Sequence, residues 1–173
     1  MIAPLSLSNL LTVLVAFGCY LTAAQQAQGG RVRPGQLAMP ACLAAVAALV
    51  LLAGVFAATW QHDLQWLAGL LAGSLLGHLR GWRLGISIDP SRGLVVMPST
   101  RDGRLAGLAL VLLAATDFTS AWLRDPVIEP QYVAAMAAFF AGYLGCRALA
   151  VAARVERARR HPPQVTPSPT DGR

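Results

Sequence analysis

Five long apolar segments run through the chain, separated by short polar connections. They cover residues 5–24, 40–60, 64–84, 105–123 and 131–153. Each segment is close to the ~20 residues that an α-helix needs to cross ~30 Å of hydrocarbon. The pattern therefore predicts an all-α integral membrane protein with five transmembrane helices. We expect one transmembrane domain over residues 1–160, followed by a proline-rich, disordered cytoplasmic tail at residues 161–173.

The composition supports the same class. Of the 173 residues, 55% are hydrophobic and 13% are charged, and the mean hydropathy is +0.53. A soluble domain carries roughly a quarter charged residues. The five segments take up most of the chain, so no room remains for a separate soluble domain.

The arginines mark one side of the membrane. Nearly all of them lie in the connections after the first and third segments and at the C-terminal end, whereas Arg124 lies in a connection of the opposite set. The positive-inside rule then places the N-terminus outside and the C-terminus in the cytoplasm, as an odd number of crossings also requires. The net charge is +6, and we expect these arginines to contact anionic lipids of the inner leaflet. We predict no nucleic-acid partner.

Five glycines stand four residues apart in the third segment, at Gly69, Gly73, Gly77, Gly81 and Gly85. Each interior glycine costs a helix about 1 kcal/mol relative to alanine, but small residues at this spacing let a second helix approach closely. A step of four residues rotates the position by about 40° on a straight helix. We therefore predict that Gly69, Gly73 and Gly77 line one packing seam, and that Gly81 and Gly85 let the helix exit.

Small residues at the same spacing offer partners for this seam within the chain. The fifth segment has such a row at Ala134, Ala138, Gly142, Cys146 and Ala150, and the fourth helix offers Gly103, Gly107 and Ala115. We favour an intrachain seam, while a homodimer or another membrane-protein partner stays open.

The connection after the first segment carries strong breakers of helix. Gly29 and Gly30 are expected to end the first helix because glycine tolerates positive φ. Pro34 and Pro40 are expected to keep the residues before the second segment out of a helix.

The sequence of the long connection between the third and fourth segments predicts a short cytoplasmic β-hairpin. Ile86 and Ile88 alternate with a serine, a DPSRG turn follows, and Leu94 to Val96 supply the second strand. The arginines around the hairpin are candidate contacts for lipid phosphates; they are Arg80, Arg83, Arg92 and Arg101.

Two ionisable side chains are expected inside the hydrocarbon itself, Asp117 and His78, and they are candidate functional residues because such groups are costly there. Asp117 lies beside Thr116, Thr119 and Ser120, and either a structural role or proton or cation handling fits it. A direct His78–Asp117 pair is not expected, since the two positions differ by roughly 12 Å in depth.

The sequence contains no signature of catalysis or of a metal site. It has no CxxC, no His/Cys cluster at ligand spacing, no phosphate loop and no nucleophile elbow. We therefore predict a protein that is not an enzyme, with no catalytic residue, metal or cofactor.

The segments RVRPGQLAMP and GHLRGWRLGISIDPSRGLVV resemble the CcdC-like group of small bacterial multi-pass membrane proteins of unknown function. The resemblance covers roughly residues 5–125 and implies a bacterial cytoplasmic (inner) membrane protein. Asp117 departs from the group, in which a more apolar or basic residue is expected. Two functions stay open: a scaffold, assembly factor or partner subunit, and a small transporter or proton-coupled permease that uses Asp117.

Overall fold

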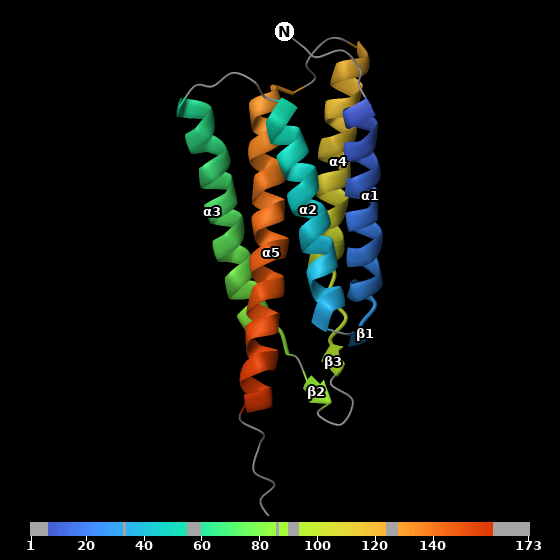
Figure 1. The fold of residues 1–173 in the computed structure, drawn as a ribbon, viewed down its shortest axis with the longest axis vertical. Coiled ribbons are helices and arrows are strands. Elements are labelled where there is room, and N and C mark those ends of the chain that lie inside the picture. Colours follow the sequence, from blue (N-terminus) through green and yellow to red (C-terminus); the bar gives the residue numbers. More distant parts are fainter. Residues whose placement is uncertain are drawn as a thin grey trace, which may run out of the picture.

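The computed structural model describes residues 7–32, 34–54, 60–85, 87–89, 94–123 and 128–160. In this part of the chain, five long helices stand side by side in an elongated bundle (Figure 1). They are α1 (Leu7–Ala27), α2 (Pro34–Gly54), α3 (Trp60–Arg83), α4 (Asp102–Leu123) and α5 (Pro130–Arg160). Successive helices run in opposite directions, so α1, α3 and α5 are parallel to one another (Figure 1).

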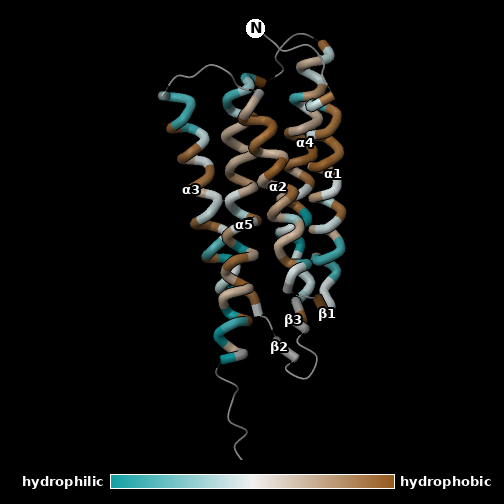
Figure 2. The backbone as a smooth tube through the Cα atoms, in the orientation of Figure 1, coloured by the Kyte–Doolittle hydropathy of each residue, from teal (hydrophilic) through white to brown (hydrophobic). Residues whose placement is uncertain are grey.

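Four of these helices, α1, α2, α4 and α5, are long and apolar enough to cross a membrane. Hydrophobic residues dominate along α1, α2 and α4, whereas α3 carries hydrophilic residues at both of its ends (Figure 2). The sequence of α3 begins with WQHDLQ and ends with HLRGWR. Its place in the bundle therefore depends more on packing than that of the other four helices.

Three short strands lie together at one end of the bundle, which we call the sheet end (Figure 1). They are β1 (Gly30–Val32), β2 (Ser87–Asp89) and β3 (Leu94–Met97). They form one antiparallel sheet in the order β1-β3-β2, with Arg31 opposite Val96 and Ile88 opposite Val95. The strands β2 and β3 fall in the connection for which the sequence predicts a hairpin, whereas β1 comes from the α1–α2 connection, where no strand is predicted.

The first helix ends at the two glycines that the sequence indicates. Gly29 and Gly30 have φ values of 78° and 130°, which are strained for any residue with a Cβ. This backbone turns the chain out of α1 and directly into β1.

The second helix begins at Pro34, so the prediction that Pro34 and Pro40 keep this segment out of a helix is wrong. Pro34 stands at the first helical position, where a missing N–H costs nothing. Pro40 removes the bond that its N–H would donate to the carbonyl of Gln36, and Gln26 Nε2 of α1 donates to that carbonyl instead, at 2.6 Å. In addition, the Cys19 thiol donates to the Pro40 carbonyl at 3.2 Å. Two side chains of α1 thus stabilise the helix around its proline.

All five helices extend beyond the predicted ranges at one end or the other: α1 continues to Ala27 rather than ending at 24, α2 begins at Pro34, and the remaining three are also longer. The third begins at Trp60 rather than at 64, because Asp63 lies in its first turn, where a carboxylate suits the helix dipole, and accepts from Trp66 Nε1 at 3.2 Å. The fourth begins at Asp102 rather than at 105 for the same electrostatic reason. The fifth continues as a basic helix to Arg160.

The bundle has two separate clusters of buried side chains. The larger one lies among α1, α2, α4 and α5 and consists mainly of alanines, with Cys19, Leu51, Leu110 and Leu144, so these helices approach closely. The smaller one lies at the sheet end and consists of Leu37, Leu84, Val151, Val155 and the partly buried Val32.

The most extensive helix–helix contact joins α3 to α5. A Cβ built on Gly69, Gly73 or Gly77 would overlap a backbone carbonyl of α5, that of Ala135, Phe139 or Tyr143 respectively. The paired residue numbers differ by the same amount each time (135 − 69, 139 − 73 and 143 − 77 all give 66). The two helices are therefore parallel and in register, with their backbones in direct contact along this face.

The seam extends further than the sequence predicts. A Cβ on Gly81 would lie 2.6 Å from the Cβ of Ala150 and 2.9 Å from the Arg147 carbonyl, so Gly81 belongs to the seam and not to the helix exit. Gly85 lies beyond the end of α3, where no atom comes within 4 Å of a built Cβ. Four contacts at one spacing require α3 and α5 to wrap around each other instead of crossing at one point. Gly142 of α5 has the corresponding position on the other helix, because a Cβ built on it would lie 2.6 Å from the Leu70 carbonyl oxygen of α3.

Candidate functional site

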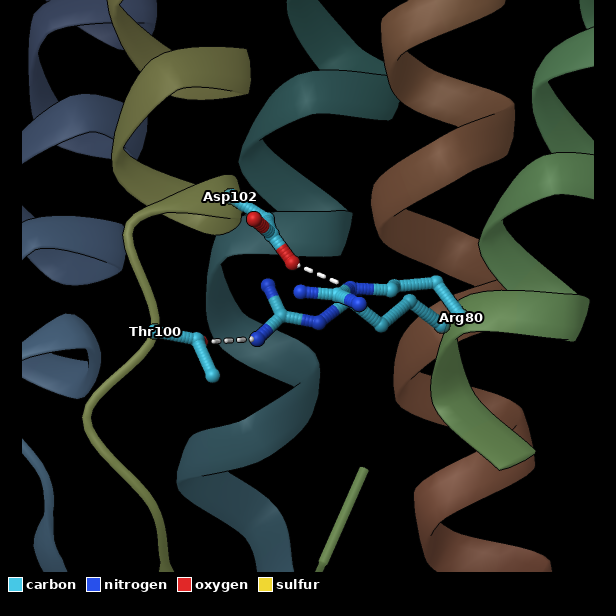
Figure 3. Close-up of polar contacts among 4 residues, drawn as sticks. Arg80, Thr100 and Asp102 are labelled. Carbon is cyan, nitrogen blue, oxygen red and sulfur yellow. Dashed lines mark hydrogen bonds and ion pairs between the residues drawn. The ribbon is translucent and has the colours of Figure 1, made fainter. Parts of the chain in front are cut away.

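Charged and polar side chains from three helices meet at the sheet end. Arg80 of α3 forms an ion pair with Asp102 of α4, and Arg147 Nη2 of α5 donates to Thr100 Oγ1 at 2.8 Å (Figure 3). We call these four residues the sheet-end charge cluster. It joins the end of α3 to the start of α4 across the face of α5.

The ends of two helices explain why opposite charges meet here. Asp102 lies in the first turn of α4, and Arg80 lies in the last turn of α3. A carboxylate is favoured at a helix N-terminus and a guanidinium at a C-terminus. Since α3 and α4 are antiparallel, these two termini lie at the same end of the bundle, and the ion pair follows.

Arg147 is the member of the cluster that lies deepest. Its Nε is buried and has no hydrogen-bond partner among the described residues. Gly103 makes room for the guanidinium, because a Cβ at that position would lie 2.6 Å from Arg147 Nη1. Asp102 and Tyr143 lie within electrostatic range of Arg147, and so does the like charge of Arg80.

In the sequence, Arg147 belongs to the basic C-terminal end, and no buried role is predicted for it. One signal was present: Phe139, Tyr143 and Arg147 are spaced by four residues, so all three fall on the face of α5 that meets the glycines of α3. A charged residue that continues a helix-packing row is expected to be buried with a partner.

A groove of about 650 Å³ lies beside the charge cluster, between α3 and α4, and Tyr143 of α5 forms part of its floor. We call it the α3/α4 groove. It exists because α3 packs closely against α5 and makes few contacts with α4. Its lining is apolar except at the sheet end, and consists of Leu76, Leu79, Arg80, Arg83, Asp102, Leu105, Ala106, Ala109, Phe139, Phe140 and Tyr143.

A second, more polar pocket of about 500 Å³ lies on the other side of the start of α4. The end of α1, with Tyr20 and Gln28, faces Thr100, Arg101 and Arg104 across it. Of the arginines that the sequence nominates for lipid phosphates, Arg80 and Arg83 thus line the groove and Arg101 lines this pocket. Arg92 lies outside the described residues.

The last turns of α5 hold the end of α3 in place. Arg154 Nη1 donates to the carbonyls of Gly81 (3.0 Å) and Leu84 (2.5 Å), which the end of a helix leaves without intrahelical partners. The guanidinium of Arg157 lies 4.9 Å from the centre of the Trp82 ring. Together with the small cluster around Val151, these contacts connect α3, α5 and the sheet.

The two ionisable residues nominated by the sequence lie apart. His78 is exposed on α3, where its Nε2 accepts from Trp82 Nε1 at 2.9 Å. Asp117 lies in the half of α4 away from the sheet and is half-buried, with no hydrogen bond or ion pair to a described residue. The neighbouring Thr116 and Thr119 donate to carbonyls one turn back in α4, at 2.9 and 2.7 Å.

No protein-family model matches the chain, and comparisons with curated proteins and with solved structures find no match. The fold and the site therefore define the class by themselves: a bundle of five helices, four of them able to span a membrane, closed at one end by a small sheet and a charge cluster. Within the described ranges, no three His, Cys, Asp or Glu side chains gather as a metal site.

Proposed function

We propose that the protein is a non-enzymatic, five-crossing protein of the bacterial cytoplasmic membrane that acts as a scaffold or partner subunit. Its N-terminus lies outside, and its sheet end lies in the cytoplasm and carries the docking surface. The resemblance of residues 5–125 to the CcdC-like group supports the assignment to a bacterial membrane.

The packing supports a full crossing by α3 despite its polar ends. Helix α3 is parallel to α5 and in register with it over the whole seam from Gly69 to Gly81. Helix α4, which joins the two, runs the other way. If α4 and α5 cross, α3 must cross as well, because its last residue, Arg83, lies level with Leu149 in this register, and α5 continues beyond that level.

The distribution of charge supports the orientation. Seven arginines with described side chains gather around the end of α3, the start of α4 and the last turns of α5; they are Arg80, Arg83, Arg101, Arg104, Arg154, Arg157 and Arg160. Positively charged residues flank membrane helices mainly on the cytoplasmic side. The sheet end therefore belongs in the cytoplasm.

The observation that carries the scaffold function is the length of helix α5. Helix α5 has 31 residues and is about 46 Å long, whereas the hydrocarbon core is about 30 Å thick. Its extra turns, residues 148–160, and the three strands form what we call the sheet-end platform. This platform has its own buried cluster, centred on Val151 and Val155. A fixed platform with its own core suits the docking of another protein.

The transport function rests on a different observation. Asp117 is a half-buried carboxyl within a membrane-capable helix and has no described partner. Ionisable groups in such positions often mark proton or ion pathways. It remains the second candidate function, and it predicts that the carboxyl of Asp117 is required.

Two matched substitutions separate the functions. Val155→Asp places a charge in the platform core, whereas Ala152→Asp places the same charge on an exposed face of α5 at the same level. A photoreactive residue at position 160 reports in cells on the protein that docks on the platform. We expect Val155→Asp to abolish the cross-linked adduct, and Ala152→Asp and Asp117→Asn to leave it intact.

The opposite pattern would refute the scaffold function. If the adduct survives Val155→Asp, the platform does not dock the partner. If proteoliposomes loaded with a pH-sensitive dye show a proton flux that Asp117→Asn abolishes, the protein is a transporter.

A further inference from the structure

The α3/α4 groove has the shape and the polarity of a site for an amphiphile. Apolar side chains line most of it, with Leu79 and Leu105 on the two walls and Phe139 and Phe140 from α5. Its charged end lies at the sheet end, with Arg80 and Arg83. Whatever fills the groove must therefore be apolar along its length and anionic at one end.

The charges at this end are unbalanced. Arg80 is paired with Asp102, but Arg83, the last residue of α3, is exposed and has no ion pair with a described residue. The groove therefore carries one net positive charge from its three charged lining residues. A phosphate that accepts from Arg83 would balance this charge, and Arg80 lies one turn away to support it.

We propose that the α3/α4 groove binds one anionic phospholipid of the cytoplasmic leaflet. Its phosphate lies at Arg83 with support from Arg80, and one acyl chain lies along Phe139 and Phe140. This inference rests on the membrane placement proposed above, because the charged end of the groove must lie at the headgroup level. The apolar part then points toward the middle of the bilayer.

The length of the groove favours a lipid over a helix from another protein. On α3 its lining runs from Leu76 to Arg83, and on α4 from Asp102 to Ala109. Each stretch covers about 10 Å along the helix axis. A partner helix that crosses the membrane would need contacts over about 30 Å, whereas a lipid chain occupies one leaflet.

The test compares lipid retention by native mass spectrometry of the purified full-length protein. The two probes are phosphatidylglycerol and phosphatidylcholine with identical acyl chains. We expect one phosphatidylglycerol to be retained in preference to phosphatidylcholine. Arg83→Gln should lower that preference about fivefold. The matched control Arg104→Gln removes an exposed arginine that also lies at the sheet end, near the start of α4, but outside the groove. It should leave the preference unchanged.

A second pair of variants tests the apolar part of the site. Ala109→Trp fills the groove from α4 without changing charge, whereas Ala45→Trp adds the same side chain to an exposed position of α2. We expect Ala109→Trp, but not Ala45→Trp, to abolish retention. Leu79→Trp fills the groove from the opposite wall and is expected to act as Ala109→Trp does, so the result does not depend on the folding of one variant.

Three outcomes would overturn the proposal. Equal losses in Arg83→Gln and Arg104→Gln would mean that the lipid responds to surface charge alone. Retention that survives both filling variants would place the lipid elsewhere. A dimer that the filling variants dissociate would assign the groove to a second copy of the chain. Carbonate extraction of cell membranes tests the membrane placement separately: a protein retained in the membrane without selective lipid binding refutes only the lipid site.

Discussion

Replacing Gly73 by alanine tests whether α3 and α5 touch through their backbones. A Cβ at this position would overlap the carbonyl oxygen of Phe139 and lie 2.7 Å from its carbonyl carbon. Ordinary van der Waals contact begins at 3.4 Å, so the carbonyl carbon alone requires a shift of at least 0.7 Å (3.4 − 2.7). Both atoms belong to the backbone of a long helix, so neither can rotate away as a side chain would.

The expected cost follows from this overlap. Overpacking of a filled interface costs about 1–3 kcal/mol, and separation of the helices also weakens the contacts at Gly69 and Gly77. Alanine itself favours a helix over glycine by about 1 kcal/mol. Gly145→Ala isolates that term, because no atom comes within 4 Å of a Cβ built there in α5. We therefore expect Gly73→Ala to be less stable than Gly145→Ala by about 1–3 kcal/mol.

The protein is unfolded in mixed micelles by increasing the fraction of a denaturing detergent. Tryptophan fluorescence and circular dichroism report the fraction of protein that is unfolded. The free energies of unfolding of the two variants and of the unsubstituted protein are compared under one condition. If Gly73→Ala unfolds at the same detergent fraction as Gly145→Ala, the backbones of α3 and α5 are not in contact at Gly73, and the proposed packing of the two helices is refuted.

Three further predictions concern local bonds and topology. Gln26→Ala removes the hydrogen bond that the Gln26 side chain donates to the carbonyl of Gln36 and should cost about 1 kcal/mol of unfolding free energy. In a Pro40→Ala background, where the backbone supplies an N–H to the same carbonyl, the change should cost less, and equal costs in both backgrounds would refute the account. Arg154→Gln should speed hydrogen exchange at the end of α3, whereas unchanged exchange would show that the guanidinium does not cap this helix. A cysteine at position 63, in a variant without the natural cysteines, should react with an impermeant maleimide from outside the cell, and labelling from the cytoplasm alone would invert the topology.

The sequence predicts the helices and the position of the seam because both depend on local spacing. Apolar length identifies a spanning segment whatever its neighbours are. Glycines four residues apart identify a packing face of α3, but they do not determine which helix lies against it. The row of small residues in the fifth segment pointed to α5. In the structure, the glycines of α3 meet the carbonyl groups of Ala135, Phe139 and Tyr143, whereas from that row Ala150 meets Gly81 and Gly142 meets Leu70 and Ser74.

The features that the sequence could not predict all depend on contacts between distant segments. Pro40 breaks a helix in isolation, and the side chain of Gln26 in α1 donates to the carbonyl that the proline cannot reach with an N–H. Arg147 resembles its basic neighbours in sequence, and its burial follows from the seam and from the space at Gly103. The strand β1 is three residues long and forms because β3 arrives beside it.

Helix α3 is the helix least suited to being stable in the membrane by itself, yet several features of the fold depend on it. Its polar ends set it apart from the four membrane-capable helices, and each interior glycine costs it about 1 kcal/mol. Its partner is α5, which is synthesised after α4, so the seam forms only after α4 and α5 are in place. The same docking event brings Arg80 to Asp102, places Leu84 in the platform core and creates one wall of the α3/α4 groove. A substitution that opens the seam should therefore weaken the platform and the lipid site together, even though neither contains Gly73.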